Sequence, residues 1–317
     1  MKNICTEKYG CRICTLYSGS GGNSTYISCG DTAILIDAGK SARALTNALR
    51  EIGAIKDKGS PEKPPIDAIF ITHEHSDHVG ALAVFLKKNP IPVHVTEGSS
   101  ERLYRIAQDT PMKDCIVSHP TIFSVTVGSL TVSSFPTSHD SRMSVGYRIT
   151  ASTPSGIRVF GYATDLGVVT PAVEKGLTGC EAVVLESNHD ENMLLDGPYP
   201  YDLKLRIRSR RGHLSNRDAA AFASFLAENG TEHFLLAHLS KENNMPVLAY
   251  EETFSALADE HLTLRVADPD GVTFLLDETL KEPLTEPPNG AMDGSEAAAE
   301  ANINCPNTHA KGAKAPC

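Results

Sequence analysis

The sequence has no tryptophan, no excess of positive charge and no long hydrophobic run. Without tryptophan, the chain has no tryptophan platform on which nucleic-acid bases could stack. The 29 basic and 39 acidic residues give a net charge of −10, which argues against nucleic-acid binding by bulk positive charge. No stretch approaches the roughly 18 uninterrupted apolar residues that a membrane span needs. The N-terminal stretch MKNICTEKYGCRIC lacks the apolar core of a signal peptide, so we expect a cytoplasmic protein.

The eight cysteines are mostly scattered along the chain. Cys11 and Cys14 form a C-x-x-C, which could be half of a zinc site or a redox pair, but no second C-x-x-C follows. Because a structural zinc site needs four ligands, we expect these two thiols to be side chains of a first strand. Without an export signal, we expect all eight cysteines to be reduced.

The order of apolar and polar segments predicts a layered fold. Strand-like and helix-like segments alternate over residues 12–108 and again over 181–276, where LTLRV and GVTFLL predict a final strand pair. Short strands over 121–165 predict an antiparallel meander. We therefore expect an α/β (α+β) fold with two β-sheets packed face to face and helices outside, in one domain spanning residues 1–280. Residues 281–317 have few large apolar side chains and predict a disordered tail.

The strongest chemical signal is THEHSDHVGAL, which follows a predicted strand. It places His73, His75, Asp77 and His78 within six residues on a turn, where their side chains can converge on one point. Imidazole suits Zn²⁺, Mn²⁺ or iron, and a carboxylate adds a hard ligand with negative charge. The segment therefore predicts a metal site.

This H-x-H-x-D-H pattern resembles the signature of the metallo-β-lactamase fold superfamily. The resemblance implies a four-layer αβ/βα sandwich and two divalent metal ions, Zn²⁺ or Mn²⁺. Further ligands are implied after later predicted strands, in LIDAG, TSHD, ATDLG and LAHLS. The resemblance assigns His73, His75 and His139 to the first metal, Asp77, His78 and His238 to the second, Asp165 as a bridge, and Asp37 as a supporting acid that orients a ligand.

Two ions about 3.5–4 Å apart can lower the pKa of a shared water and stabilise charge on attacking and leaving oxygens. That chemistry suits phosphodiesters, and also lactams and thioesters, so the metal motif alone leaves the substrate open. SGSGGN contributes Ser18, Ser20 and Asn23, which could cradle a phosphate or simply form a tight turn. The basic run KLRIRSRRGH, with Arg210 and Arg211 at its end, could follow a phosphate backbone or form a solvated helix face.

Together with ESNHDENML and GHLSN, these segments resemble the YycJ/WalJ-like metallo-hydrolases of bacteria, which are relatives of ribonuclease Z. The resemblance extends from about residue 13 to 280 and implies a metal-dependent phosphodiesterase with 5′–3′ exonuclease activity, acting on DNA in preference to RNA. It implies that His213 contacts phosphate and protonates the leaving group, that Glu186 orients it, and that His189 contacts substrate. Asp77 counts with His213 and Glu186 among the catalytic residues. An RNA-processing nuclease and a small-molecule ester or thioester hydrolase are the alternatives.

Overall fold

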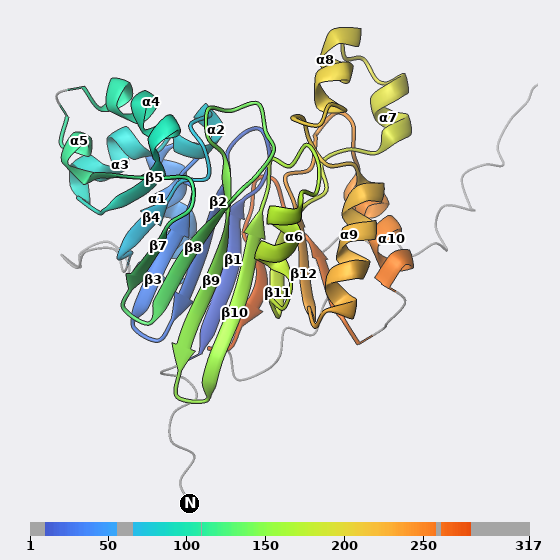
Figure 1. Ribbon diagram of the computed structural model, residues 1–317. Helices are drawn as coiled ribbons and strands as arrows, with labels where there is room; N and C mark the ends of the chain where they lie inside the picture. Colours follow the sequence, from blue (N-terminus) through green and yellow to red (C-terminus); the bar gives the residue numbers. More distant parts are fainter. Residues whose placement is uncertain (1–9, 56–65, 109, 258–260, 280–317) are drawn as a thin grey trace, which may run out of the picture.

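The computed structural model describes residues 10–55, 66–108, 110–257 and 261–279. These residues form two seven-stranded sheets that pack face to face (Figure 1). The strand orders are β14-β1-β2-β3-β4-β5-β6 and β13-β12-β11-β10-β9-β8-β7. The predicted tail at 281–317 lies outside the described residues. None of the helices in the described ranges has the length and apolar character needed to cross a lipid bilayer.

The first sheet begins with antiparallel strands and continues with parallel strands joined through helices. Its strands are β1 (Cys11–Tyr17), β2 (Ser24–Cys29), β3 (Thr32–Ile36), β4 (Ala68–Phe70), β5 (Val93–Thr96), β6 (Ile116–His119) and β14 (Thr273–Asp277). The helices of this half are α1 (Ala42–Glu51), α2 (Ser76–Val79), α3 (Leu82–Lys88), α4 (Glu97–Ala107) and α5 (Met112–Cys115).

The second sheet begins with the predicted antiparallel meander, β7 to β10, and this prediction is confirmed. Its strands are β7 (Ser124–Val127), β8 (Leu130–Pro136), β9 (Val145–Thr153), β10 (Gly156–Ala163), β11 (Ala182–Glu186), β12 (His233–Ala237) and β13 (Thr263–Val266). The helices of this half are α6 (Pro171–Leu177), α7 (Glu191–Asp196), α8 (Tyr201–Ile207), α9 (Asn216–Glu228) and α10 (Pro246–Leu257).

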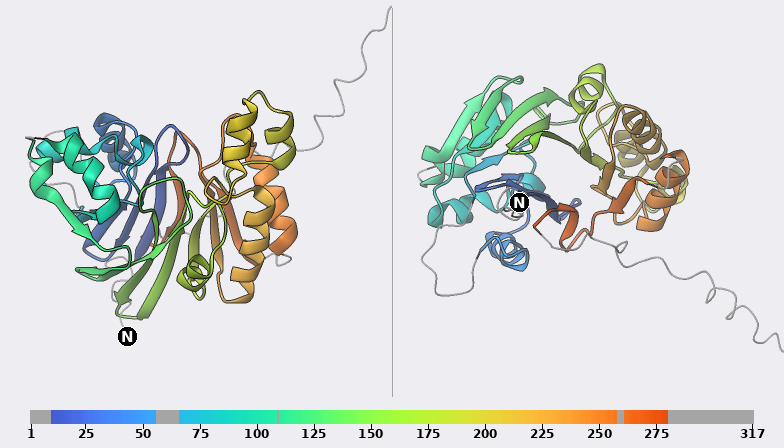
Figure 2. Two further views of the ribbon diagram at one scale, coloured as in Figure 1. Left: turned by 45° about the horizontal axis from the view of Figure 1, so that its top comes forward. Right: turned by 90° about the horizontal axis from the view of Figure 1, so that it is seen from below.

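Strand side chains build the layers because successive residues point to opposite faces. In β3, Ile34 and Ile36 pack between the sheets, whereas Ala33 and Leu35 pack on the helix-covered face. The parallel strands are therefore apolar on both faces, as expected for strands covered by a second sheet and by helices. Figure 2 shows the helices outside the two sheets. The predicted α/β sandwich is confirmed.

One sequence expectation is corrected. The segments LTLRV and GVTFLL do not pair with each other, because β13 joins β12 in the second sheet and β14 joins β1 in the first. The turn between them crosses from one sheet to the other and is held by Asp268 Oδ1, which accepts from the backbone N–H groups of Asp270 and Gly271.

Cys11 and Cys14 lie in β1, as expected, with both thiols buried. Cys11 packs in the core between the sheets, whereas Cys14 packs in the core on the helix-covered face of the first sheet. Because the two side chains point to opposite faces, they cannot bind one metal ion together.

Candidate metal centre

The predicted ligands lie where strands of both sheets end, at the upper end of the sandwich in Figure 1. Asp37 follows β3, His73 lies beyond the end of β4, Asp165 lies just beyond β10 and His238 follows β12. Asp37, Asp165 and His238 have φ angles of 61°, 58° and 59°. A left-handed backbone is uncommon for residues other than glycine and is concentrated at functional sites. At these three positions the chain turns sharply as it leaves the strand.

The loop that carries the H-x-H-x-D-H residues is held by backbone contacts with two neighbouring loops. The Asp77 carbonyl accepts from the Asn23 N–H at 2.7 Å, and the His78 carbonyl accepts from the Ala38 N–H at 2.8 Å. Gly39 lies between these loops, and a Cβ there would overlap the Asp77 carbonyl oxygen. Glycine is therefore required at position 39 for the loops to approach each other this closely.

His73, His75 and His139 form a first group of potential ligands. One ring nitrogen of each lies within 4.8 Å of the others, and His73 Nε2 is 3.0 Å from His75 Nδ1. Burial lowers the pKa of His73 and of His139. Both rings are therefore neutral at neutral pH, which is the form of histidine that binds metals.

Asp77, His78 and His238 form a second group in which the donor atoms also lie within 4.8 Å of one another. Asp77 Oδ2 is 3.4 Å from His78 Nε2 and 3.9 Å from His238 Nε2. Burial alone would raise the pKa of Asp77, but the two neighbouring imidazoles lower it. The carboxylate therefore carries its negative charge across the whole physiological pH range.

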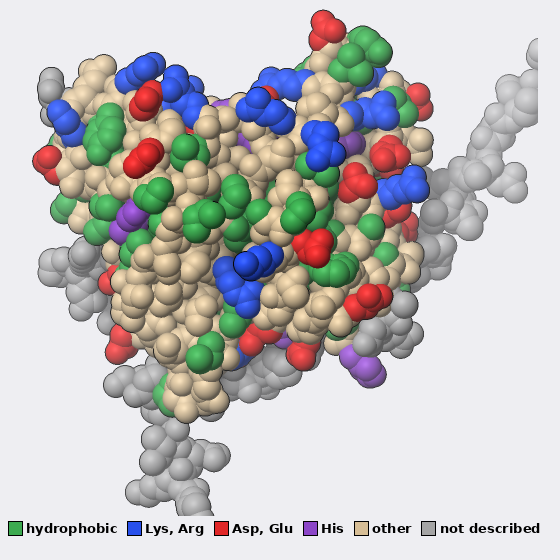
Figure 3. Space-filling view, viewed as in Figure 1, with side chains coloured by type: hydrophobic (Ala, Val, Ile, Leu, Met, Phe, Trp, Pro, Cys, Tyr) green, Lys and Arg blue, Asp and Glu red, His purple; other side chains and the backbone are tan. Residues whose placement is uncertain are grey.

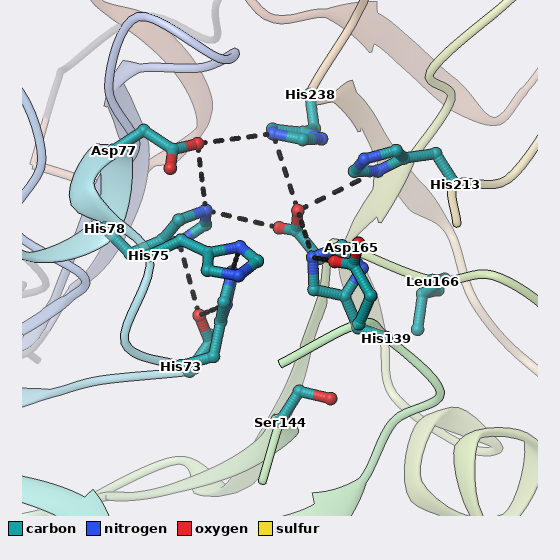
Figure 4. Close-up of polar contacts among 12 residues, drawn as sticks. His73, His75, Asp77, His78, His139, Ser144, Asp165, Leu166, His213 and His238 are labelled. Carbon is teal, nitrogen blue, oxygen red and sulfur yellow. Dashed lines mark hydrogen bonds and ion pairs between the residues drawn. The ribbon is translucent and has the colours of Figure 1, made fainter. Parts of the chain in front are cut away.

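The Asp165 carboxylate lies between the two groups (Figure 4). Its oxygens are 3.4 Å from His78 Nε2, 3.7 Å from His139 Nε2 and 3.6 Å from His238 Nε2. Asp165 Oδ2 and His238 Nε2 are buried and have no hydrogen-bond partner. Buried polar atoms are normally paired, so these two atoms indicate a ligand at the centre of the cluster. The donor set, with one carboxylate shared by two triads, fits two divalent cations.

Asp37 and Thr72 fix the orientation of His78. Asp37 is fully buried, and its Oδ2 lies 2.8 Å from His78 Nδ1. The Thr72 N–H and hydroxyl donate to the same carboxylate. A carboxylate oxygen can only accept, so His78 Nδ1 carries the proton and Nε2 faces the cluster.

Glu186 fixes the orientation of two other histidines, His213 and His238. Its Oε1 lies 2.8 Å from His213 Nδ1 and 2.9 Å from His238 Nδ1, and its Oε2 accepts from the backbone N–H groups of Leu166 and Leu214. Burial alone would raise the pKa of Glu186, but the two imidazoles lower it to about 2. One buried carboxylate thus connects His238 with His213, whose side chain is 22% exposed.

The charges of the site favour cations. Burial alone would lower the pKa of His238, but Asp165, Asp77 and Glu186 raise it to about 10. Without a metal, the carboxylates are therefore balanced by a proton on the imidazole. A cation that binds there must displace this proton, so metal affinity rises with pH.

The SGSGGN loop supports the cluster instead of opening to a ligand. The Ser18 hydroxyl accepts from the His238 N–H at 2.7 Å. Asn23 accepts from the Gly19 N–H, donates to the Gly19 carbonyl, and lies 3.3 Å from Asp77 Oδ2. Both side chains are buried, so of the three residues expected to cradle a phosphate only Ser20 is exposed.

His189 is also buried, at 3% exposure, and its Nδ1 has no hydrogen-bond partner. Burial lowers its pKa to about 4, so the ring is neutral. It lies three residues beyond the end of β11, where its backbone carbonyl accepts from the Asn216 N–H.

Some arginines of the basic run KLRIRSRRGH form ion pairs or hydrogen bonds within the protein, and others do not. Arg206 forms an ion pair with Asp140, and Arg211 donates to the carbonyls of His139 and Ser141. These contacts fix the loop that carries His139. Arg210 is exposed, and its side chain makes no ion pair within the described part of the chain.

Sequence reasoning missed two acidic residues beside the ligands. Asp140 Oδ1 lies 3.2 Å from His139 Nε2. Glu74 is 5% exposed and accepts from the Ser99 hydroxyl and the Arg142 N–H. The only signal for either was its place next to a predicted ligand, in SHD and in HEH. Leu166, which follows Asp165, packs in the apolar core, and its backbone N–H donates to Glu186 Oε2.

The family model for a β-lactamase superfamily domain matches residues 32–239, and the chain belongs to this superfamily. Exodeoxyribonuclease YycJ of Bacillus anthracis is 35% identical over 244 residues, which are 76% of this chain and 86% of the relative. Exodeoxyribonuclease WalJ of Streptococcus pneumoniae is 34% identical over 287 residues, 88% of this chain and 99% of the relative. The metallo-β-lactamase fold protein YhfI of Bacillus subtilis superposes with a TM-score of 0.61 at 16% identity, covering 84% of this chain and 99% of that chain. The resemblance to the YycJ/WalJ-like branch is confirmed.

Proposed function

We propose that the protein is a metal-dependent phosphodiesterase that degrades DNA from the 5′ end. The observation that carries the proposal is the position of Asp165. Its carboxylate lies between two triads of potential ligands, and its Oδ1 is 3.8 Å from His213 Nδ1. The names of the relatives YycJ and WalJ, both exodeoxyribonucleases, support DNA as the substrate.

In this proposal each triad holds one divalent ion. His73, His75 and His139 hold the first, Asp77, His78 and His238 hold the second, and Asp165 bridges them. Two ions bound there would lower the pKa of a shared water and neutralise charge on the phosphoryl oxygens. Imidazole with carboxylate accepts both Zn²⁺ and Mn²⁺, so the ion in use follows from availability.

The chain's own residues orient the substrate and supply a proton. Glu186 accepts from His213 Nδ1, which leaves Nε2 of this 22%-exposed side chain to face the substrate. From that position Nε2 can donate a hydrogen bond to a phosphoryl oxygen and then transfer a proton to the leaving oxygen. Asp37 keeps His78 in its ligand tautomer, and Arg210 adds positive charge on the substrate side.

We place this activity in the cytoplasm. The buried thiols Cys11 and Cys14 suit a reducing compartment, and a DNA substrate is found there.

A substrate panel tests the proposed reaction class. Purified protein with Mn²⁺ or Zn²⁺ is expected to hydrolyse bis-p-nitrophenyl phosphate, and to leave nitrocefin and S-lactoylglutathione intact. The phosphodiester is preferred because the Arg210 guanidinium matches the geometry of a phosphate, and two ions would neutralise charge on its phosphoryl oxygens. Turnover of S-lactoylglutathione without turnover of the phosphodiester would instead favour a thioester hydrolase.

His213→Ala is expected to lower kcat on a 5′-phosphorylated DNA end by about 10²–10⁴-fold, the usual contribution of a general acid. Metal content, measured by mass spectrometry, is expected to stay at the wild-type value, because this residue belongs to neither triad. The matched control is His233→Ala, at the start of β12 and therefore at the opposite end of that strand from His238. A rate equal to wild type in His213→Ala would remove this residue from the mechanism.

A further inference from the structure

A second group of arginines lies on the other side of the metal centre from the basic run. Arg102 and Arg105 of α4 line a cavity of about 350 Å³ with Arg142, Glu74 and Ile106. In the space-filling view, basic side chains gather over α4 and again beneath α8, with histidines between them (Figure 3). The two basic surfaces therefore flank the site, although the protein as a whole carries a net charge of −10.

The cavity is joined directly to the proposed ligands. Glu74 lies between His73 and His75 in the sequence, and its carboxylate forms part of the cavity wall. It accepts from the Ser99 hydroxyl of α4 at 2.6 Å and from the Arg142 N–H at 3.0 Å. Both carboxylate oxygens are therefore engaged. The wall of the cavity is rigidly attached to the metal loop.

Close packing places Arg142 beside the arginines of α4. Gly98, in the first turn of α4, lies so near the 142–143 segment that an added Cβ would be 2.8 Å from the Cβ of Met143. Arg142 follows His139 by three residues, so the loop that supplies a proposed ligand also supplies a cavity wall.

The cavity has unbalanced positive charge. Arg142 forms an ion pair with Glu101, whereas Arg102 and Arg105 are exposed and make no ion pair with any residue that the structure describes. Glu74 keeps its negative charge, because its two donors are a neutral hydroxyl and a neutral amide, so three arginines stand against two carboxylates, Glu74 and Glu101. Two guanidinium groups are thus available to an anion, and a guanidinium matches the geometry of phosphate.

We propose that this arginine cavity binds a backbone phosphate of the substrate strand, away from the bond that is cut. The inference rests on the proposed function, because it assigns the cavity to the same nucleic-acid substrate. A strand held by Arg102 and Arg105 on one side and by Arg210 on the other crosses the proposed metal centre. The cavity then favours polynucleotides over single nucleotides.

The experiment measures binding of a fluorescein-labelled single-stranded DNA 20-mer at several salt concentrations. Arg102→Ala/Arg105→Ala removes two phosphate contacts. The plot of log affinity against log salt has a negative slope, and we expect the size of this slope to decrease by about 1.4. Lys87→Ala/Lys88→Ala, in the last turn of α3, removes the same charge and is expected to keep the wild-type slope. Thermal unfolding midpoints equal to wild type establish that both variants are folded.

An unchanged slope in the arginine variant overturns the inference while leaving the proposed function intact, provided that the wild type still cleaves DNA. An equal fall in both variants overturns it as well, because overall charge would then account for the effect. A wild-type protein that cleaves no nucleic acid overturns the proposed function itself. The slope and the cleavage assay therefore separate the two failures.

Discussion

Asp165→Asn is expected to lower the rate of phosphodiester hydrolysis by at least about 10³-fold. This loss exceeds the roughly 10²–10³-fold effect of removing a single hydrogen bond to the transition state. The Asp165 carboxylate lies within 3.7 Å of His78, His139 and His238, and no other described carboxylate contacts both triads. An amide keeps the shape but removes the charge that two cations would share. Metal content per protein, measured together with kcat on labelled DNA, is expected to fall below the wild-type value.

Asp31→Asn provides the matched control for this experiment. Asp31 is exposed in the turn between β2 and β3, at the opposite end of β3 from Asp37. It is expected to behave as wild type in both metal content and rate. Full activity in Asp165→Asn would show that Asp165 does not hold the two ions together.

Glu186→Gln is expected to lower both stability and activity. Four N–H groups converge on this buried carboxylate, two from imidazoles and two from the backbone of Leu166 and Leu214. A glutamine amide must turn its NH₂ group toward one of these pairs, so at least two donors lose their acceptor. We expect a loss of roughly 2–4 kcal/mol in the free energy of unfolding, measured by urea denaturation in EDTA.

The same change is expected to lower hydrolysis by about 10–100-fold at saturating metal, because His238 and His213 lose the group that orients them. Glu232→Gln, which is exposed ahead of β12, is the control and is expected to match wild type in both assays. If Glu186→Gln kept wild-type stability and rate, the carboxylate would not be organising these two rings.

The layers of the fold were predictable because the spacing of apolar residues distinguishes strands from helices. Strand-like and helix-like segments alternate along the chain, and the two-sheet arrangement followed from their order. The pairing of the last two strands was not predictable, because LTLRV and GVTFLL are separated by a turn that crosses between the sheets. Neither segment contains a signal for which sheet it joins.

The cluster of potential ligands was predictable because its residues stand in one dense motif and at the ends of predicted strands. Its surroundings were not, because they depend on contacts between distant segments. Ser18 and Asn23 are in a glycine-rich loop that resembles an anion cradle, yet both side chains bond inward. Arg102 and Arg105 look like ordinary helix-surface residues in the sequence, and only packing of α4 against the Arg142 loop makes them a cavity.

The central claim is that two metal ions bound by the triads around Asp165 serve to cut DNA from its 5′ end. Product mapping on 5′-labelled and 3′-labelled single- and double-stranded DNA, with RNA alongside and metals added one at a time, tests it most directly. The account predicts stepwise release of nucleotides from the 5′ end of DNA with Mn²⁺ or Zn²⁺, abolished by EDTA. Cleavage that persists in EDTA, or no cleavage of DNA with any divalent ion, would contradict it.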